Sequence, residues 1–438
     1  MEEIRMKKKI LSMLLAASMV ATLGACGSNT DKASKTDKAS SADASSAEKK
    51  ADDPVQTLIK NTKGTVDLTV WCSETEQYQN AMKEIVDSFK QKYSDVDFNI
   101  TIGSESEANC KDDVLKDVQE AADIFIFPDD QLKGLVEAGA LQSVDATYTY
   151  DPRETNSEMT VDAASMNGKL YAYPLTSSNG YFLFYDKNVF SEDDVKTMDG
   201  MLAKAAEKGK TVGMEVSGAW YLYSFFKGAG LDLDMNDDGT NSCNWNATDT
   251  KYKGTDVAKA ITELCKNKAF KNCVNEDAQA DALNGKMAAD VNGTWATDAF
   301  KKAYGDGFAA AKLPTYTVNG DQVQMASFRG YKFAGVNAYS KQTGWAMLLA
   351  EYITSQENQT KIYEATGEGP ANTEALKSAS SPALDALDAQ SQYAYLQRVG
   401  NEYWTPAASL GQNLVEGKYS DAQKLLDDAV KGITKKAS

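Results

Sequence analysis

Apolar residues near the start of the folded body alternate between the spacing of strands and that of helices. Segments 66–71 and 98–102 place them at every second position, and 82–93 places them three or four apart. Segment 123–127 is a continuous apolar run ending at a proline, typical of a strand buried on both faces, and a helical spacing follows. This order predicts an α/β fold on a mainly parallel sheet, with ligands bound where the strands end, after Trp71 and Phe127.

The length of the body predicts two lobes. The body runs from about Pro54 to Ser438, and a single hydrophobic core rarely serves more than about 250–300 residues. The middle of the body has mostly helical spacing. Predicted helices cover 193–208, 219–227, 256–268, 297–304, 344–354 and 420–433.

The N-terminus has the pattern of an export signal. A basic stretch, 5–9, precedes an apolar run, 10–23, which is shorter than the ~20 residues of a membrane span. The small residues before Cys26 resemble the lipobox of bacterial lipoproteins, so 1–25 is predicted to be a signal peptide and Cys26 to carry a lipid. A plain signal peptide with an incidental cysteine is the alternative. Residues 26–53 have no aromatic or large aliphatic side chain and predict a disordered tether.

Charge and composition restrict partners and chemistry. The formal net charge of −17 disfavours nucleic acid and anionic lipid surfaces and suits an exported protein with a neutral ligand. The chain has no histidine, which excludes His-based catalysis and His-based metal sites. Segment 234–239 resembles the opening of a calcium loop, but the twelfth position is Trp245 instead of Glu, so a turn is the preferred interpretation. We expect no cofactor and no metal.

Cysteine pairing is open at the level of sequence. If Cys26 carries a lipid, the other cysteines can pair in an oxidising exterior. We predict the disulfides Cys243–Cys273 and Cys72–Cys110. Cys265 lies on the apolar stripe of the predicted helix 256–268 and is expected to be a buried free thiol.

Several segments match a known protein family in the same order. They are LTVWCSETE (68–76), AADIFIFPDDQLKGLVEAGAL (121–141), NGKLYAYPLTSSNGYFLFYDK (167–187), VNGTWA (291–296), KLPTY (312–316) and NEYW (401–404). No single segment is diagnostic, but together they resemble the family 1 extracellular solute-binding proteins, specifically the maltose and maltodextrin-binding branch.

This resemblance implies a two-lobed periplasmic-binding-protein fold. Two discontinuous α/β lobes would be joined by two or three hinge strands, with a ligand cleft between them. We expect 54–175 and 313–362 to form the N-terminal lobe, and 176–312 and 363–438 to form the C-terminal lobe.

The resemblance also implies ligand contacts. The family stacks sugar rings on aromatic side chains, and the matching positions are Phe127, Trp220, Tyr221, Trp295 and Trp404. Acidic contacts to sugar hydroxyls follow the first and third strands, where this chain has Glu74 or Glu76, and Asp130.

The chain departs from the family at three places. Phe127 replaces the Trp of the best-known members, Gln131 replaces a basic residue, and 177–179 replaces a cleft Glu. Asn179 in that last segment remains a candidate contact. These departures leave the linkage and length of the sugar open.

Packing in the core is the alternative for each aromatic residue. Core packing is the preferred interpretation for Trp71. For Trp220 and Tyr221, core packing and ligand contact are equally favoured, because both residues open a helix that Ser217 could cap. Trp295 and Trp404 stand at loop-to-helix entries, where ligand contacts are common. The acidic candidates would in most proteins be solvated surface charges.

As a whole, the resemblance implies a substrate-binding lipoprotein of an ABC sugar importer, and not an enzyme. It would capture maltose or maltodextrin-type α-gluco-oligosaccharides by lobe closure and deliver them to permease subunits. It would act as a monomer at the outer face of the cell membrane of a Gram-positive-type cell, held there only by lipidated Cys26. A binder of another oligosaccharide, a starch-binding surface module and a two-carboxylate glycosidase are the alternatives, although no carboxylate pair stands out.

Overall fold

The computed structural model describes residues 53–236 and 238–436. The predicted signal peptide, Cys26 and the predicted tether up to residue 52 lie outside the described residues, as does Asp237 of the Asp-rich segment. Within the described part of the chain, no helix combines the length and the apolar character that a membrane crossing requires.

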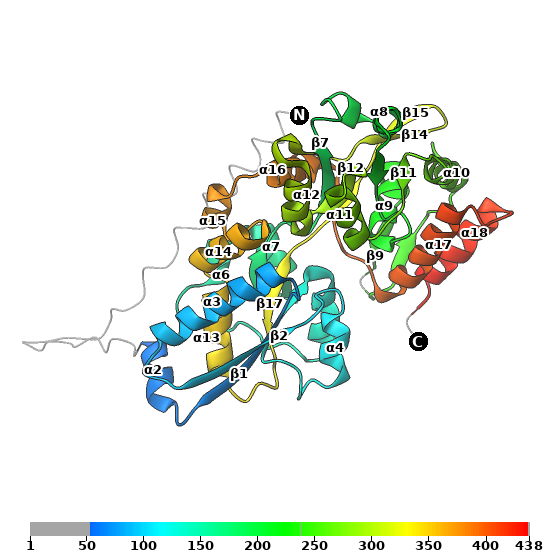
Figure 1. The fold of residues 1–438 in the computed structure, drawn as a ribbon. Helices are drawn as coiled ribbons and strands as arrows, with labels where there is room; N and C mark the ends of the chain where they lie inside the picture. The colour runs from blue at the N-terminus through cyan, green and yellow to red at the C-terminus, as the bar shows by residue number, and fades with distance from the viewer. Residues whose placement is uncertain (1–52, 237, 437–438) are drawn as a thin grey trace, which may run out of the picture. The chain divides into compact units, whose positions relative to one another are not determined.

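The first lobe is built on a five-stranded sheet with the order β2-β1-β3-β17-β6. Strands β1 (Val66–Cys72), β2 (Phe98–Ser104) and β3 (Ile124–Pro128) are parallel, which confirms the predicted order. Strand β17 (Lys332–Val336) lies antiparallel between β3 and β6 (Ala172–Thr176). In Figure 1 this late strand, in yellow, lies beside strands from the start of the body, in blue and cyan.

Helices of the first lobe pack against this sheet and one another. They are α2 (Pro54–Asn61), α3 (Glu76–Lys92), α4 (Cys110–Lys116), α5 (Leu132–Glu137), α6 (Pro152–Thr155), α7 (Glu158–Ala163), α13 (Thr343–Ile353), α14 (Gln356–Thr366) and α15 (Thr373–Ser378). The short strands β4 (Ser165–Met166) and β5 (Lys169–Leu170) form a hairpin before β6.

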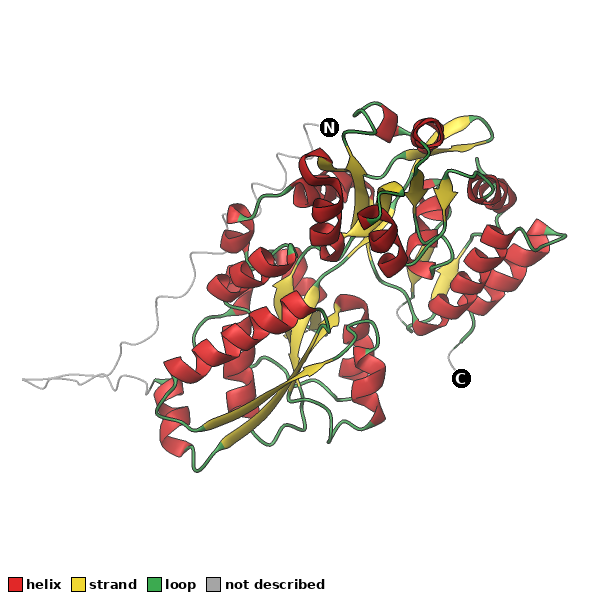
Figure 2. Cartoon of the chain, viewed as in Figure 1, coloured by secondary structure: helices red, strands yellow, loops and turns green. Residues whose placement is uncertain are grey.

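The second lobe has its own five-stranded sheet, with the order β11-β8-β12-β7-β13. Its strands are β7 (Tyr181–Asp186), β8 (Thr211–Gly213), β11 (Phe270–Lys271), β12 (Met287–Gly293) and β13 (Phe308–Ala311). Its helices are α8 (Met198–Lys208), α9 (Ala219–Gly228), α10 (Gly254–Cys265), α11 (Asn275–Leu283), α12 (Thr297–Tyr304), α16 (Pro382–Gln390), α17 (Trp404–Glu416) and α18 (Ala422–Ile433). Figure 2 shows the strands of both sheets in yellow with helices in red packed against them.

Smaller strand pairs complete the second lobe. Strands β9 (Leu233–Met235) and β10 (Asn241–Cys243) form one hairpin, and β14 (Thr315–Val318) and β15 (Asp321–Gln324) form another. Strand β16 (Ser327–Arg329) pairs in parallel with β18 (Ala394–Leu396).

The predicted helices are confirmed in place and differ by a few residues at their ends. Helix α12 coincides with the predicted 297–304, and α18 begins two residues after the predicted start at 420. The predicted 193–208 begins with a 3-10 turn, Asp194–Lys196, before α8. Helices α10, α12 and α18 were predictable because each buries one apolar stripe, whereas α9 and α13 are buried on most of their surface.

Two expected boundaries between the lobes differ from the observed ones. We expected the chain to re-enter the first lobe at 313, but the β14–β15 hairpin buries Tyr316 and Val323 in the second core, and the return begins near Gly330. We also expected the final departure at 363, but α14 continues to Thr366 against α3, and α15 packs on α14. Asn372 before α15 also pairs with Asn156 of the first lobe. Helix α16 is the first element of the last segment to join the second lobe, through Ala383 and Ala386.

The segments that pass between the lobes are bonded to one another. Ser177 donates its backbone N–H to Gly369 O at 2.9 Å and its hydroxyl to Pro370 O at 2.8 Å. The buried hydroxyl of Ser178 accepts the N–H of Gly369 at 2.7 Å. Asn179 donates its N–H to Gly330 O at 3.3 Å. The passage is therefore a bonded hinge region, and Asn179 is part of it.

A buried ion triad lies at the start of β17. The Lys332 ammonium is 2.6 Å from Glu107 Oε2 and 2.9 Å from Glu368 Oε1. Burial opposes the charge on Lys332, but the two carboxylates outweigh it and hold the pKa of Lys332 above its ordinary value. Burial raises the pKa of Glu107, and Lys332 partly offsets that rise. The triad ties the loop after β2 and the loop after α14 to the hinge strand.

The predicted disulfides are wrong, because the structure has free thiols at all five cysteines that it describes. Cys243 packs against one core cluster of the second lobe and Cys273 belongs to another. Cys72 and Cys110 are both buried as separate thiols in the first core. The free thiol predicted at Cys265 is confirmed, although its side chain is only partly buried.

A carboxylate lies inside the second sheet. Asp290 on β12 is 1 % exposed, and Asn292 Nδ2 donates to its Oδ2 at 2.9 Å. Burial raises the pKa of Asp290 to about 7, although Asn292 opposes the rise. The folded chain therefore keeps a proton between about pH 4 and 7 that the unfolded chain releases, so stability falls as the pH rises through this window.

Replacing Lys332 with Met should strongly destabilise the protein. The two carboxylates would remain buried without their cation, which typically costs about 3–5 kcal/mol of unfolding free energy. The urea midpoint of unfolding measures the change. The control is Lys341→Met, at an exposed lysine of the same lobe. Equal midpoints for the two variants would contradict the role of the triad.

Replacing Asp290 with Asn should raise the melting temperature at pH 8 by about 5 °C or more and change it little at pH 5, because the isosteric amide needs no proton. Calorimetry at pH 5, 6.5 and 8 measures this. The exposed Asp249→Asn variant is the control, and its melting temperature should follow that of the wild type. A parallel pH dependence in D290N and wild type would count against a proton held at Asp290.

Candidate functional site

Asp130 follows β3 at the carboxyl edge of the first sheet. The strand runs directly into a 3-10 turn, Asp129–Gln131. Oδ1 of Asp130 is buried and has no hydrogen-bond partner among the described residues. Burial raises the pKa of Asp130 to about 6, while the Gln397 amide and the Lys111 ammonium oppose the rise. Asp130 therefore offers an acceptor atom that the described protein does not use.

Asp129 fixes this turn to the hinge. Its N–H donates to Tyr331 O at 3.0 Å, and its Oδ1 accepts the N–H of Tyr331 at 3.1 Å. A Cβ at Gly330 would lie 2.3 Å from Asp129 Oδ1, so only glycine fits there. Burial, and then the charge of Asp130, raise the pKa of Asp129 to about 8.

Gln131, which replaces the family's basic residue, holds a neighbouring loop. Its Nε2 donates to the carbonyl oxygens of Glu107 and Ala108, each at 2.9 Å, and its Oε1 accepts the N–H of Lys111 at 2.8 Å. The side chain is 6 % exposed. Gln131 therefore positions the loop that carries Lys111 and Glu107.

Two partly buried indoles lie together in the second lobe. Trp220 in the first turn of α9 and Trp295 after β12 have ring centroids 5.6 Å apart, inclined by 39°. Tyr181 supports Trp220 edge-on at 4.6 Å, and its hydroxyl donates to Trp220 O at 3.0 Å. A Cβ at Gly293 would lie 2.0 Å from the Trp295 ring, so glycine allows this indole to fold over its own strand.

Contacts from late in the chain link these groups. The Trp220 indole N–H donates to Gln397 Oε1 at 2.5 Å, and the Gln397 amide acts to lower the pKa of Asp130. Lys111 Nζ of the first lobe donates to Asn401 Oδ1 of the second at 2.8 Å. The bond between Lys111 and Asn401 therefore joins the two lobes, and Gln397 holds the Trp220 indole.

Two of the predicted aromatic contacts belong to the core instead. Phe127 is 0 % exposed and packs against Phe125 and Phe333, so it has no face to offer a ligand. It is buried because both faces of β3 are covered. Tyr221 is 7 % exposed and packs against Tyr181, which leaves little of its ring available.

The other predicted residues lie in different surroundings. Trp404 is partly buried at the start of α17 and packs edge-on against Tyr403 at 5.1 Å. Glu74 and Glu76 are exposed after β1, and Glu74 adds to the raised pKa of Glu107. None of the hydrogen bonds and ring contacts of the described residues joins Trp404 or Glu76 to Asp130 or Trp220.

Sequence reasoning missed Gln397, Lys111, Asn401 and Tyr181. Asn401 and Tyr181 lie inside matched segments but were not singled out, and Gln397 and Lys111 lie outside those segments. The place of each depends on partners far away in the chain.

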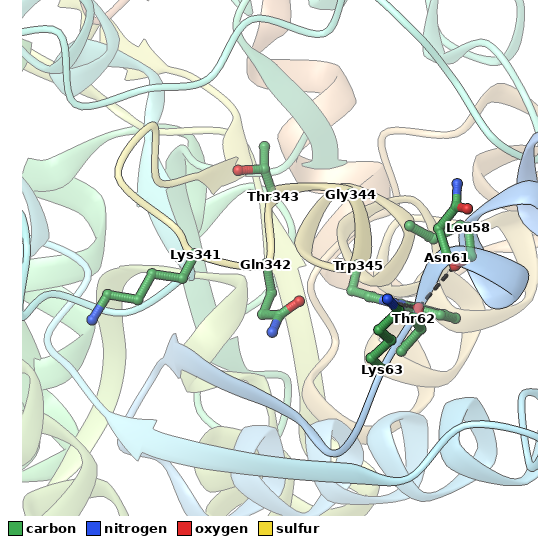
Figure 3. Close-up of a pocket in the computed structure, with 9 residues that line it drawn as sticks. All are labelled: Leu58, Asn61, Thr62, Lys63, Lys341, Gln342, Thr343, Gly344 and Trp345. Atoms are coloured by element: carbon green, nitrogen blue, oxygen red, sulfur yellow. Dashed lines mark hydrogen bonds between the residues drawn. The ribbon is translucent and has the colours of Figure 1, made fainter.

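A separate cavity of about 370 Å³ lies between the end of α2 and the start of α13. Figure 3 shows Trp345 directed at Thr62, whose hydroxyl accepts the indole N–H at 2.8 Å, while Lys341 extends away from the other lining residues. None of the predicted ligand contacts lines this cavity.

Comparison with known proteins shows the family of the chain. Residues 84–389 match the family described as bacterial extracellular solute-binding protein. A galactooligosaccharide-binding protein of Bacillus subtilis is 26 % identical and aligns over 97 % of this chain and 96 % of its own length. A maltooligosaccharide ABC transporter solute-binding lipoprotein of Streptococcus pneumoniae is 25 % identical over 87 % of this chain and 90 % of its own.

Solved structures agree in fold. The maltodextrin-binding protein MalE1 from L. casei, without ligand, has a TM-score of 0.70 and 28 % identity, covering 85 % of this chain and 100 % of that one. The Thermus thermophilus maltotriose-binding protein has a TM-score of 0.71 at 21 % identity, covering 84 % and 99 %, and supports the two-lobed fold alone. The chain belongs to the family of bacterial extracellular solute-binding proteins.

Proposed function

We propose that this protein is the substrate-binding lipoprotein of an ABC sugar importer and that its ligand is a maltooligosaccharide. The observation that carries the proposal is the partly buried Trp220–Trp295 pair in one lobe, together with an Asp130 carboxylate in the other that has an unused acceptor atom. An indole plane suits the apolar face of a glucose ring, and a carboxylate suits its hydroxyls.

Lobe closure follows from where these groups lie. The indoles belong to the second lobe and Asp130 to the first, so a sugar that contacts both favours the closed arrangement. The hinge around Ser177 and Gly330 is where the backbone would rotate. A closed, sugar-loaded form would then be the one that docks on permease subunits.

The relatives support an oligosaccharide but divide on which one. The B. subtilis and S. pneumoniae proteins named for maltodextrins and maltooligosaccharides support an α-glucan. The protein named for galactooligosaccharides aligns with nearly the whole chain, so a galactooligosaccharide is the second candidate. Identities near 25 % leave room for either ligand, and the aromatic pair would serve both.

Calorimetric titration with maltotriose, maltoheptaose and a galactooligosaccharide distinguishes the candidates. We expect micromolar binding of maltotriose, equivalent to about −8 kcal/mol. Trp295→Ala should weaken this binding by about tenfold or more, because it removes one of the two planes. Trp220→Ala should do the same.

The control is Tyr339→Ala, at an exposed aromatic residue that is not one of the proposed sugar contacts, and this variant should bind as the wild type does. If only the galactooligosaccharide gives a heat of binding, the second candidate ligand is the correct one. Absence of heat with all three sugars would refute the sugar proposal, and shortened maltoheptaose products would favour an enzyme.

The lipid anchor is part of the proposal. Expressed in a Gram-positive host, the wild-type protein should partition into the detergent phase of a Triton X-114 extraction. Cys26→Ala should move it to the aqueous phase, because the thioether-linked lipid cannot form. Detergent-phase recovery of the Ala variant would rule out anchoring through Cys26.

A further inference from the structure

Lys111, in the first turn of α4, is held in place along its length. Gln131 Oε1 accepts its backbone N–H at 2.8 Å. A Cβ at Gly134 would lie 3.0 Å from Lys111 Cδ, so the aliphatic stem lies close against α5. The side chain is only 15 % exposed, whereas lysine side chains are mostly solvated. Lys111 therefore has little rotational freedom left to lose when its ammonium meets a partner.

Helix α4 itself does not account for a cation at this position. The free N–H groups of a first helical turn favour negative charge, which Asp112 and Asp113 supply. The Lys111 ammonium is 3.4 Å from Asp112 Oδ1, but that carboxylate is 77 % exposed, so the pair contributes little. Asn401 of the second lobe, whose Oδ1 accepts from Lys111 Nζ at 2.8 Å, is the better partner.

The second lobe holds Asn401 as firmly. The preceding residue, Gly400, donates its N–H to Oδ1 of the buried Asn241 at 2.6 Å. Tyr403, in the same 3-10 turn as Asn401, is 0 % exposed, and its hydroxyl donates to Ala219 O at 2.6 Å. The turn that carries Asn401 is therefore fixed to the start of α9.

We propose that Lys111 and Asn401 form an interlobe latch, a direct contact that stabilises the closed arrangement of the lobes in addition to the contacts made by the ligand. The turn of Asp130 fixes one end of the latch, and the first residue of α9, next to Trp220, fixes the other. The inference deepens the proposed function and rests on it for the identity of the ligand. Because the latch favours the closed arrangement, it tightens binding chiefly by slowing release.

The experiment is a double-mutant cycle of Lys111→Met and Asn401→Leu in the full chain, with maltotriose as the ligand. Within the described part of the chain, Lys111 is the one hydrogen-bond partner of the Asn401 side chain, so N401L removes the latch and no other bond. The Lys111 ammonium also acts to lower the pKa of Asp130, an effect that K111M removes and N401L leaves in place. Tryptophan fluorescence gives the affinity, and stopped-flow mixing gives the dissociation rate.

We expect K111M and N401L each to weaken maltotriose binding by about fivefold, mainly through faster dissociation. The double variant should bind no more weakly than K111M, because the latch is already absent there. Wild-type affinity in N401L, or losses that multiply in the double variant, would overturn the inference.

The controls replace the same residue types where their contacts stay within one helix. Lys116 on α4 is 76 % exposed and pairs with Asp113 of the same helix. Asn413 on α17 donates its Nδ2 to Ser409 O at 2.7 Å. Lys116→Met and Asn413→Leu should bind as the wild type does. If these controls lose as much affinity as the latch variants, the loss is a general effect of substitution and the inference fails.

Small-angle X-ray scattering without sugar tests the latch independently of the ligand. K111M and N401L should have a larger radius of gyration than the wild type, because the lobes separate more often without the latch. If the wild type binds no maltooligosaccharide, the proposed ligand is refuted, and the scattering alone decides on the latch. Equal radii for the wild type and both variants would then overturn it, and larger radii in both variants would support it.

Discussion

The first sheet is complete only after the chain has returned from the second lobe, because β17 fills the place between β3 and β6. Tyr331, just before β17, is hydrogen-bonded to Asp129. The first residue of the strand, Lys332, forms ion pairs with two carboxylates. A returning strand therefore fixes the turn that carries Asp130. The hinge, the sheet and this half of the site depend on one antiparallel insertion, which also makes each lobe discontinuous in sequence.

The strands and helices that face a single core were predictable from the sequence. Strands β1, β2 and β3 and helix α3 follow from apolar periodicity, because each buries one set of side chains. Membership of a lobe was not predictable for the β14–β15 hairpin, since alternation shows that Tyr316 is buried but not in which core. For Phe127, the continuous apolar run already indicated a strand covered on both faces, and that physical argument outweighs the resemblance.

The candidate site was predicted in part, and for a definable reason. Asp130, Trp220 and Trp295 follow strands or begin helices, which are local signals that one sequence carries. Gln397 contacts Trp220 across 177 positions, and Lys111 contacts Asn401 across 290. No local pattern encodes such pairs. The disulfide predictions failed for the same reason, because spacing gives the size of a loop and not the distance between its ends.

The free thiols bear on how the motion of the lobes can be followed. Burial raises the pKa of Cys72, Cys243 and Cys273 to about 12 and that of Cys110 well above its ordinary range. Thiol-directed dyes react with the thiolate, which is scarce at such sites near neutral pH. A cysteine introduced at an exposed position in each lobe should therefore react with a dye much faster than these buried native thiols do. The distance between the two dyes can then be recorded while sugar is added.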